Sequence, residues 1–264
     1  MKEKLTISSL RDMKQAGEKI ASLTAYDACF ARVLDEAGVD IILVGDSLGM
    51  VVHEEENTLG VTMDDMVYHA RIACKDIQRA LCVVDMPYRS YTTPSQALEN
   101  ANRLLDAGAE VVKLEGGEEI LDILRHLVKH NIQVCGHLGL LPQSIKQYGG
   151  FKVQGREKKD AERIIKNAKI LEETGVGAVV LECIPSDLAA EVSRSLAIPT
   201  IGIGAGSQCD GQVLVLYDVL GISSYIPRMA NDFLQGRGSI REAIEAYVSA
   251  VKSGSFPTAG QSFS

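Results

Sequence analysis

The sequence lacks tryptophan and is poor in aromatic residues, which make up 5% of its 264 residues. Proteins that bind single-stranded nucleic acid stack its bases on such side chains. Acidic residues outnumber basic ones by 35 to 27, so the formal net charge is −8. Net negative charge disfavours nucleic acid and anionic membranes as partners. We therefore expect neither as a partner, although a local basic pocket is compatible with this balance.

Long apolar runs and paired cysteine motifs are also missing. No stretch approaches the roughly 20 apolar residues of a membrane span, and the first 19 residues are too polar for a signal peptide. The six cysteines show no CxxC spacing. Cys82, Cys135 and Cys183 lie in apolar runs, where free cysteine behaves as a small hydrophobic residue. We expect a soluble, reduced, cytoplasmic protein without disulfides.

An alternation of short apolar runs with helical segments fills the chain instead. The runs are rich in Val, Ile, Leu and Ala, as strands buried on both faces should be. The predicted strands span residues 20–27, 40–47, 80–87, 111–116, 133–140, 178–184, 199–206 and 212–221. The last is the least distinct, because its sequence could also begin a helix.

Segments with helical periodicity separate these runs. The predicted helices span residues 28–37, 95–107, 118–130 and 160–174. Asp27 and Thr93-Pro94 are start signals, and Gly38 and Gly108 mark the turn into the next strand. Eight alternations close a barrel, whereas fewer would give an open doubly wound sheet.

We therefore predict a single α/β domain over residues 1–264, a (β/α)₈ TIM-type barrel. An amino-terminal helix is expected within residues 1–17, at 7–16, and carboxy-terminal helices and a tail within 228–264. Those helices are predicted within 230–236 and 239–253. We expect these additions to cover the barrel bottom or to make subunit contacts. The Gly/Ser-rich tail is expected to be partly disordered or folded over a neighbour.

Ionisable residues stand at the carboxyl ends of five successive predicted strands, where barrel enzymes have their active sites. They are Asp46, Asp85, Lys113 with Glu115, His137 and Glu182. Charged groups inside apolar strands are costly unless they are paired, metal-bound or hydrated. This repetition predicts an active site at that end of the barrel.

Asp46 and Asp85 are predicted at matching heights on neighbouring strands. Two adjacent carboxylates repel unless a cation or a proton lies between them. All-oxygen ligation with few protein ligands suits Mg²⁺, and Glu115 could complete the shell directly or through a water. The alternative is that these residues are solvated strand ends or helix N-caps.

Lys113 and Glu115 are two residues apart, so both leave the strand on one face. A lysine there could hold a carboxylate and stabilise an enolate oxygen, or form a buried salt bridge to Glu115 or Glu182. Ser47 could donate a hydrogen bond to a substrate carboxylate.

Glu182 lies in an apolar run, and a buried carboxylate suits a general base that removes a proton from carbon. The alternative is a structural role. His137 could be a donor in the site or structural. The glycine run 202–206 could cradle a phosphate, or allow a tight strand-to-loop passage.

Long motifs spread over the whole chain resemble ketopantoate hydroxymethyltransferase. They are residues 24–27 (TAYD), 43–50 (LVGDSLGM), 112–117 (VKLEGG), 134–140 (VCGHLGL), 149–156 (GGFKVQGR), 181–183 (LEC), 201–206 (IGIGAG) and 253–257 (SGSFP). The resemblance implies transfer of a hydroxymethyl group from 5,10-methylenetetrahydrofolate to 3-methyl-2-oxobutanoate. The product is 2-dehydropantoate (ketopantoate), on the route to pantothenate and coenzyme A.

The resemblance also implies roles for residues. Asp46 and Asp85 match ligands of one Mg²⁺ per subunit, with Glu115 in its shell. Asp46, Ser47, Asp85 and Lys113 match residues that contact the keto acid, and Glu182 matches the proton acceptor. A large homo-oligomer, a decamer, is implied as well.

Two positions depart from the family pattern: Gly60 stands where proline is usual, and Tyr88 where phenylalanine is common. Glycine loosens what proline would fix, so we expect an effect on loop closure and not on chemistry. One rival function is a Mg²⁺-dependent carbon–carbon lyase or mutase of the related α-keto-acid barrels, although their Lys-Lys-Cys-Gly loop is absent. Another is a non-catalytic barrel that binds a keto acid or serves as a scaffold, which would not need Glu182.

Overall fold

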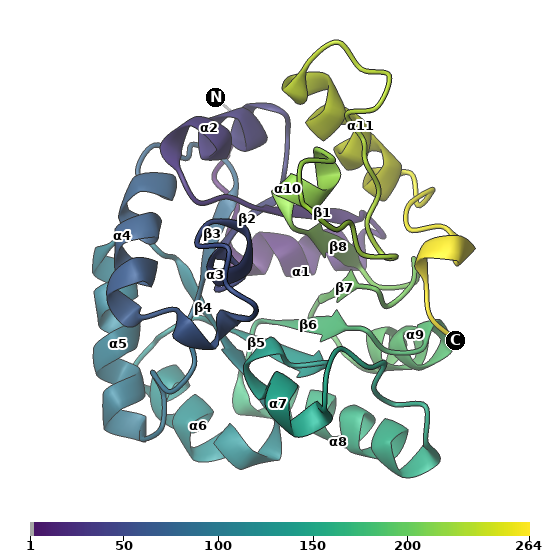
Figure 1. Cartoon of the computed structure of the whole chain (residues 1–264). Helices are drawn as coiled ribbons and strands as arrows, with labels where there is room; N and C mark the ends of the chain where they lie inside the picture. Colours follow the sequence, from purple (N-terminus) through teal and green to yellow (C-terminus); the bar gives the residue numbers. More distant parts are fainter. Residues whose placement is uncertain (1–2) are drawn as a thin grey trace.

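A computed structural model describes residues 3–264 of the chain and contains a closed barrel of eight parallel strands. The strands are β1 (Ile20–Thr24), β2 (Ile41–Val44), β3 (Leu81–Asp85), β4 (Val111–Glu115), β5 (Val134–Gly139), β6 (Ala178–Glu182), β7 (Thr200–Ile203) and β8 (Gly211–Leu214). Each pairs with the next strand in sequence, and β8 closes the barrel against β1 (Figure 1). The predicted (β/α)₈ barrel is confirmed.

Helices surround the barrel and connect its strands (Figure 1). The longer ones are α2 (Ala28–Glu36), α4 (Met63–Ala73), α5 (Pro94–Asp106), α6 (Leu121–Lys129), α8 (Lys158–Thr174), α9 (Ser186–Ser195) and α11 (Ile240–Lys252). Short turns of helix lie in the loops: α3 (Leu48–Val51), η1 (Thr58–Gly60), η2 (Glu118–Ile120), η3 (Pro142–Ser144), α7 (Ile145–Tyr148), α10 (Leu216–Val219) and η4 (Ala259–Gln261). The predicted caps are confirmed, because the side chains of Asp27 and Thr93 accept amide hydrogen bonds from the first turns of α2 and α5.

Two apolar cores hold the barrel together. The larger fills the space between the strands and the surrounding helices, and the smaller fills the barrel interior. Helix α1 (Ile7–Gln15) contributes Leu10 and Met13 to the interior core, beside residues that begin strands, such as Ile20 and Leu81. It therefore closes the amino-terminal end of the barrel, as predicted, and leaves the opposite end open. Residues 1–2 of the predicted amino-terminal segment lie outside the described residues.

Two predictions about the carboxy-terminal part were wrong. Strand β8 ends at Leu214, and the rest of the predicted run turns into α10. Residues 230–236 form no helix; there the Asp232 carboxylate accepts hydrogen bonds from two following amides and stabilises a turn instead.

The tail is ordered against its own barrel. Phe256 is buried, with its ring centroid 5.8 Å from that of Tyr247 on α11. The Phe263 carbonyl accepts hydrogen bonds from the amide and hydroxyl of Ser186, so the chain ends beside α9 (Figure 1). The tail was expected to be loosely ordered because it is rich in Gly and Ser, but its apolar side chains pack against the barrel.

The remaining predictions about the chain as a whole concern cysteines and membranes. All six cysteines are free, and Cys82, Cys135 and Cys183 are buried as predicted. Within residues 3–264, none of the helices combines the length and apolar character needed to cross a membrane.

Candidate active site

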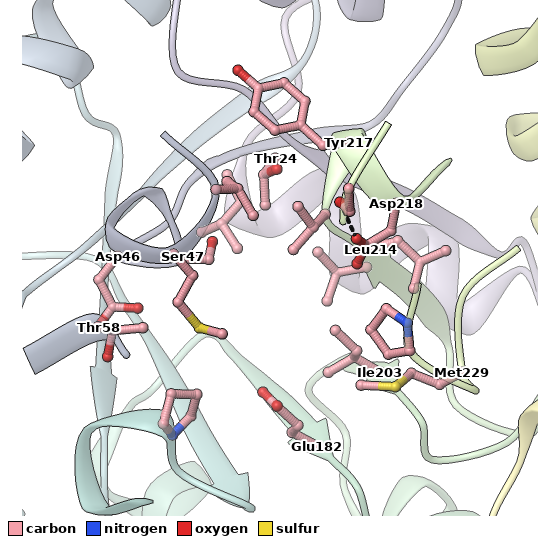
Figure 2. A pocket seen from close by; sticks show the side chains of 18 of the residues that line it. Thr24, Asp46, Ser47, Thr58, Glu182, Ile203, Leu214, Tyr217, Asp218 and Met229 are labelled. Atoms are coloured by element: carbon pink, nitrogen blue, oxygen red, sulfur yellow. Dashed lines mark hydrogen bonds between the residues drawn. The ribbon is translucent and has the colours of Figure 1, made fainter. Parts of the chain in front are cut away.

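A cavity of about 580 Å³ opens at the carboxyl ends of the strands (Figure 2). All the predicted site residues line it: Asp46, Ser47, Asp85, Lys113, Glu115, His137 and Glu182. Sequence positions up to 136 residues apart are thus brought to one place by the barrel. That convergence is confirmed, whereas the individual roles stay predictions.

The strand register sets the relative heights of these side chains. Asp85 pairs with Lys113 across β3 and β4, Glu115 with His137 across β4 and β5, and Gly139 with Glu182 across β5 and β6. Asp46 follows the end of β2 in a turn, and its amide donates a 3.0 Å hydrogen bond to Asp85 Oδ2. This turn, rather than continued strand pairing, places the two aspartates side by side.

Three carboxylates are removed from solvent in this cluster. Asp46, Asp85 and Glu115 are 3%, 3% and 6% exposed, so they are not solvated strand ends. Burial raises the pKa of Asp46 well above its usual range, and the charges of Asp85 and Glu115 raise it further. Ionising all three carboxylates is therefore costly unless a cation or a proton lies among them.

Lys113 supplies one positive charge to the cluster. Its Nζ lies 2.9 Å from Asp85 Oδ1, so the buried salt bridge considered as the alternative role exists, but with Asp85 and not with Glu115 or Glu182. Burial acts to lower the pKa of Lys113, but the charges of Asp85, Glu115 and Asp46 outweigh it and the net direction is upward. The ammonium therefore stays protonated beside the carboxylates.

His137 bridges the two ends of the cluster. Its Nδ1 lies 3.4 Å from Glu115 Oε1, and its Nε2 lies 3.1 Å from Glu182 Oε2. Burial and the charge of Lys113 lower the pKa of His137, but hydrogen bonds to Glu115 and Glu182 raise it more, to about 9. In its protonated form the imidazole pairs with both carboxylates, and its Nδ1 also lies 3.4 Å from Lys113 Nζ.

The backbone around Glu182 allows little variation. Cys183 has a φ of 48°, a left-handed conformation that is uncommon outside glycine. Gly139 lies against it, with a φ of 97°, and a Cβ atom there would come within 2.2 Å of the Glu182 carbonyl oxygen. That carbonyl accepts a 2.8 Å hydrogen bond from Leu140 N. Only glycine fits at position 139.

Gln143, at the start of η3, was missed by the sequence analysis. Its amide group donates to Asp46 Oδ2 at 2.8 Å and to the Met86 carbonyl at 2.9 Å, and its backbone N–H donates to Glu115 Oε2 at 3.0 Å. Tyr91 donates a 2.6 Å hydrogen bond to Gln143 Oε1. Gln143 therefore joins two of the carboxylates. Its sequence context, a polar residue after a proline, does not reveal this.

Ser47 is linked to Tyr26, another residue not singled out from the sequence. Their hydroxyl oxygens are 2.9 Å apart, and either can be the donor. Burial raises the pKa of Tyr26, so the phenol stays neutral and can act as a donor or an acceptor. Tyr26 thereby fixes the position of the Ser47 hydroxyl at the cavity wall.

The cluster offers only a few oxygen ligands to a metal ion. In the described part of the chain, no three His, Cys, Asp or Glu side chains converge closely enough to hold one ion by themselves. The buried atoms Asp85 Oδ1 and Glu115 Oε1 lie 2.9 Å from Lys113 Nζ and 3.4 Å from His137 Nδ1, but neither accepts a hydrogen bond of normal geometry in this part of the chain. Mg²⁺ binds through one or two carboxylates and keeps several waters. The donor set fits such an ion and does not fit a fully protein-ligated one.

The glycine run at the end of β7 forms a tight passage. Gly204 and Gly206 have positive φ values, and a Cβ at Gly206 would lie 2.6 Å from Ser186 Cβ. The close approach of two chain segments accounts for these glycines, so the structural interpretation is the one that the packing supports.

Comparisons with known proteins agree with this geometry. A sequence model of the family described as ketopantoate hydroxymethyltransferase matches residues 4–259. The chain is 52% identical to 3-methyl-2-oxobutanoate hydroxymethyltransferase from Shewanella oneidensis, over 98% of this chain and 99% of the relative. It is 54% identical to the enzyme of that name from Ruthia magnifica, over 96% of this chain and 98% of the relative.

Solved structures share the fold at low sequence identity. Oxaloacetate acetylhydrolase in complex with 3,3-difluorooxalacetate is 14% identical with a TM-score of 0.63, over 96% of this chain and 98% of that one. Phosphonopyruvate hydrolase in complex with oxalate and Mg²⁺ is 12% identical with a TM-score of 0.61, over 97% and 92%. These likenesses concern the barrel alone, whereas the sequence matches cover the whole chain at high identity. The chain therefore belongs to the ketopantoate hydroxymethyltransferase family.

Proposed function

We propose that this chain transfers a hydroxymethyl group from 5,10-methylenetetrahydrofolate to 3-methyl-2-oxobutanoate and so makes 2-dehydropantoate for pantothenate and coenzyme A biosynthesis. The observation that carries the proposal is the convergence of three buried carboxylates, a buried lysine and the His137–Glu182 pair on one cavity. The names of the family and of its members support the keto acid as acceptor, and the resemblance implies 5,10-methylenetetrahydrofolate as donor.

Asp46 and Asp85 would hold one Mg²⁺, with Glu115 bound to it directly or through a water. The buried excess of carboxylates supports this assignment, and phosphonopyruvate hydrolase, which has the same fold, was solved with oxalate and Mg²⁺. Mg²⁺ bound there would polarise the keto group and make the neighbouring C–H bond more acidic.

Lys113 and Ser47 would bind the keto acid. The Lys113 ammonium stays protonated beside the carboxylates, so it can attract the substrate carboxylate and stabilise the oxygen on which negative charge develops. Ser47, positioned by Tyr26, would donate a hydrogen bond to the substrate carboxylate. Asp46 and Asp85 would contact the keto acid in the same cluster.

Glu182 would remove the proton from C3 of the keto acid. Its carboxylate faces the cavity and pairs with His137 at 3.1 Å, which suits a positioned general base. The carbon that has lost its proton then attacks the methylene carbon carried by the folate. A carbon–carbon bond forms, and both bonds from that methylene to the folate nitrogens break. The two nitrogens take up the proton removed from C3 and one proton from the water whose hydroxyl group enters the product.

The test is deuterium exchange at C3 of 3-methyl-2-oxobutanoate, followed by NMR with Mg²⁺, with and without tetrahydrofolate. We expect exchange that is abolished by EDTA and by Glu182→Gln. Glu173→Gln, an exposed position on α8, is the matched control and should exchange like the wild type. Absence of exchange under every condition would remove the enolate mechanism and favour the lyase or binding-protein alternatives. Full turnover by Glu182→Gln would remove Glu182 as the base.

The resemblance also supports a proposal for assembly and location. We propose a decamer, which light scattering would report as ten times the chain mass of 28.5 kDa. A cytoplasmic location is proposed as well, in keeping with small-molecule metabolism, and fractionation of cells expressing the protein would check it.

A further inference from the structure

The cavity extends beyond the carboxylate cluster into a second part, beneath the loop that follows β8. Its walls are mostly apolar: Leu214, Val215, Tyr217, Ile222, Pro227 and Met229. Figure 2 shows Asp218 on this side, across the cavity from Asp46 and Ser47. The roles proposed above for the keto acid use none of these residues. A volume of about 580 Å³ falls in the range of pockets for drug-sized ligands, and a small keto acid would leave much of it empty.

Asp218 is the acidic group of this second part. It lines the cavity, yet it is only 7% exposed. Its Oδ1 accepts a 2.6 Å hydrogen bond from the Ser223 hydroxyl, and no other hydrogen bond to its carboxylate is found among the described residues. Burial raises its pKa. A buried carboxylate among apolar walls costs free energy unless donors satisfy its oxygens, so this carboxylate suits a ligand that brings donors.

The pterin ring of a reduced folate carries the matching donors. Its pyrimidine edge presents a ring N–H and an amino group side by side, and two parallel donors fit the two oxygens of a carboxylate. We propose that Asp218 binds the N3–H and 2-amino edge of the folate pterin, with Ser223 holding the carboxylate in position. This inference rests on the proposed function, because folate enters as the co-substrate.

Exposed apolar side chains at the rim of the cavity could contact the part of the folate that extends beyond the pterin. Phe151, Ile222 and Tyr225 line the cavity, and their side chains are 60%, 61% and 76% exposed. Large exposed apolar side chains gathered at a pocket mouth mark a binding site. They would pack against the p-aminobenzoyl group as it leaves the pocket.

The experiment measures tetrahydrofolate binding by titration calorimetry for the wild type and for Asp218→Asn. The variant keeps the acceptor for Ser223 but places an amide where the ligand needs an acceptor. We expect the affinity to fall about 10- to 100-fold, the range for a hydrogen bond to a charged group. Asp122→Asn, an exposed position on α6 with 90% side-chain exposure, should bind like the wild type.

A folate analogue without the 2-amino group gives a second arm. It should bind the wild type more weakly than tetrahydrofolate does, but lose little further affinity in Asp218→Asn, because the two changes remove the same interaction. Ser223→Ala should weaken tetrahydrofolate binding less than Asp218→Asn does. If Asp218→Asn fails to fold, the two ligands can still be compared on the wild type. An analogue affinity equal to that of tetrahydrofolate would overturn the proposal.

The outcomes separate this inference from the proposed function. If the wild type transfers the hydroxymethyl group and Asp218→Asn binds tetrahydrofolate equally well, the pterin assignment is wrong and the function stands. If the wild type neither binds tetrahydrofolate nor exchanges C3 of the keto acid, the proposed function itself fails.

Discussion

Replacing Asp46 by asparagine should make the metal-free protein more stable. Asp46 is buried beside two other carboxylates, and its pKa is raised by burial and by their charges, so ionising it at neutral pH opposes folding. Asparagine has the same shape and keeps an oxygen that can accept the hydrogen bond from Gln143. Single stabilising substitutions commonly raise the free energy of unfolding by about 0.5–2 kcal/mol. For a chain of this size that corresponds to roughly 1–8 °C in Tm.

The pH dependence of this gain follows from the direction of the pKa shift. Because the pKa of Asp46 is higher in the folded than in the unfolded chain, the folded state binds an extra proton between the two values. The contribution of Asp46 to the stability of the wild type therefore falls as pH rises through that window. The gain in stability from Asp46→Asn should be near zero at pH values below the pKa of Asp46 in the unfolded chain. It should reach its full size at pH values above the pKa of Asp46 in the folded chain.

Urea denaturation in EDTA over a series of pH values measures this difference. Asp122→Asn, exposed on α6, is the control that should show no such pH-dependent gain. With Mg²⁺ at 100 times its Kd, the wild type should gain about 2.7 kcal/mol, whereas Asp46→Asn should gain much less and lose C3 exchange. A variant less stable than the wild type in EDTA at neutral pH, or a gain independent of pH, would refute the reasoning.

Three further substitutions test the supports of the site. Gln143→Leu should lower the free energy of unfolding in urea by about 2 kcal/mol or more, because it leaves buried groups, including the Asp46 carboxylate, without their donor. An unchanged urea midpoint would contradict this. Gly139→Ala should still fold but lower turnover by more than about tenfold, since the added carbon displaces the Glu182 backbone. Turnover equal to the wild type would contradict the requirement for glycine at this position. Tyr247→Phe removes a hydroxyl that bonds two barrel carbonyls and should cost about 0.5–1.5 kcal/mol with turnover retained; a loss of turnover at full stability would contradict its structural role.

The barrel could be predicted because its signal is local. Each strand is a short apolar run, and glycines such as Gly38 and Gly108 stand where the chain turns with positive φ. The prediction failed at β8, where an apolar run continues from strand into α10. Hydrophobicity alone does not distinguish the two conformations when both are buried.

The acidic cluster could be predicted for a related reason. Asp85, Lys113 and Glu115 are ionisable residues inside otherwise apolar strands, which is unusual in any sequence. Gln143 and Asp218 have no such contrast, because they lie in loops or short helical turns where polar residues are ordinary. Their importance comes from burial, which tertiary structure alone creates.

The residues that support the cluster differ in kind from those that compose it. Gln143 reaches Asp46 from 97 positions away in the sequence, and His137 connects glutamates from two different strands. Gln143 carries no charge of its own, and its role is to satisfy the polar atoms of the charged residues around it. A buried site with excess negative charge is costly, and the cost is borne only if its oxygens are held by donors that cannot move away. The stability of the empty cluster should therefore depend more on Gln143 than on any one carboxylate, since losing a carboxylate relieves repulsion while losing the donor adds an unsatisfied group.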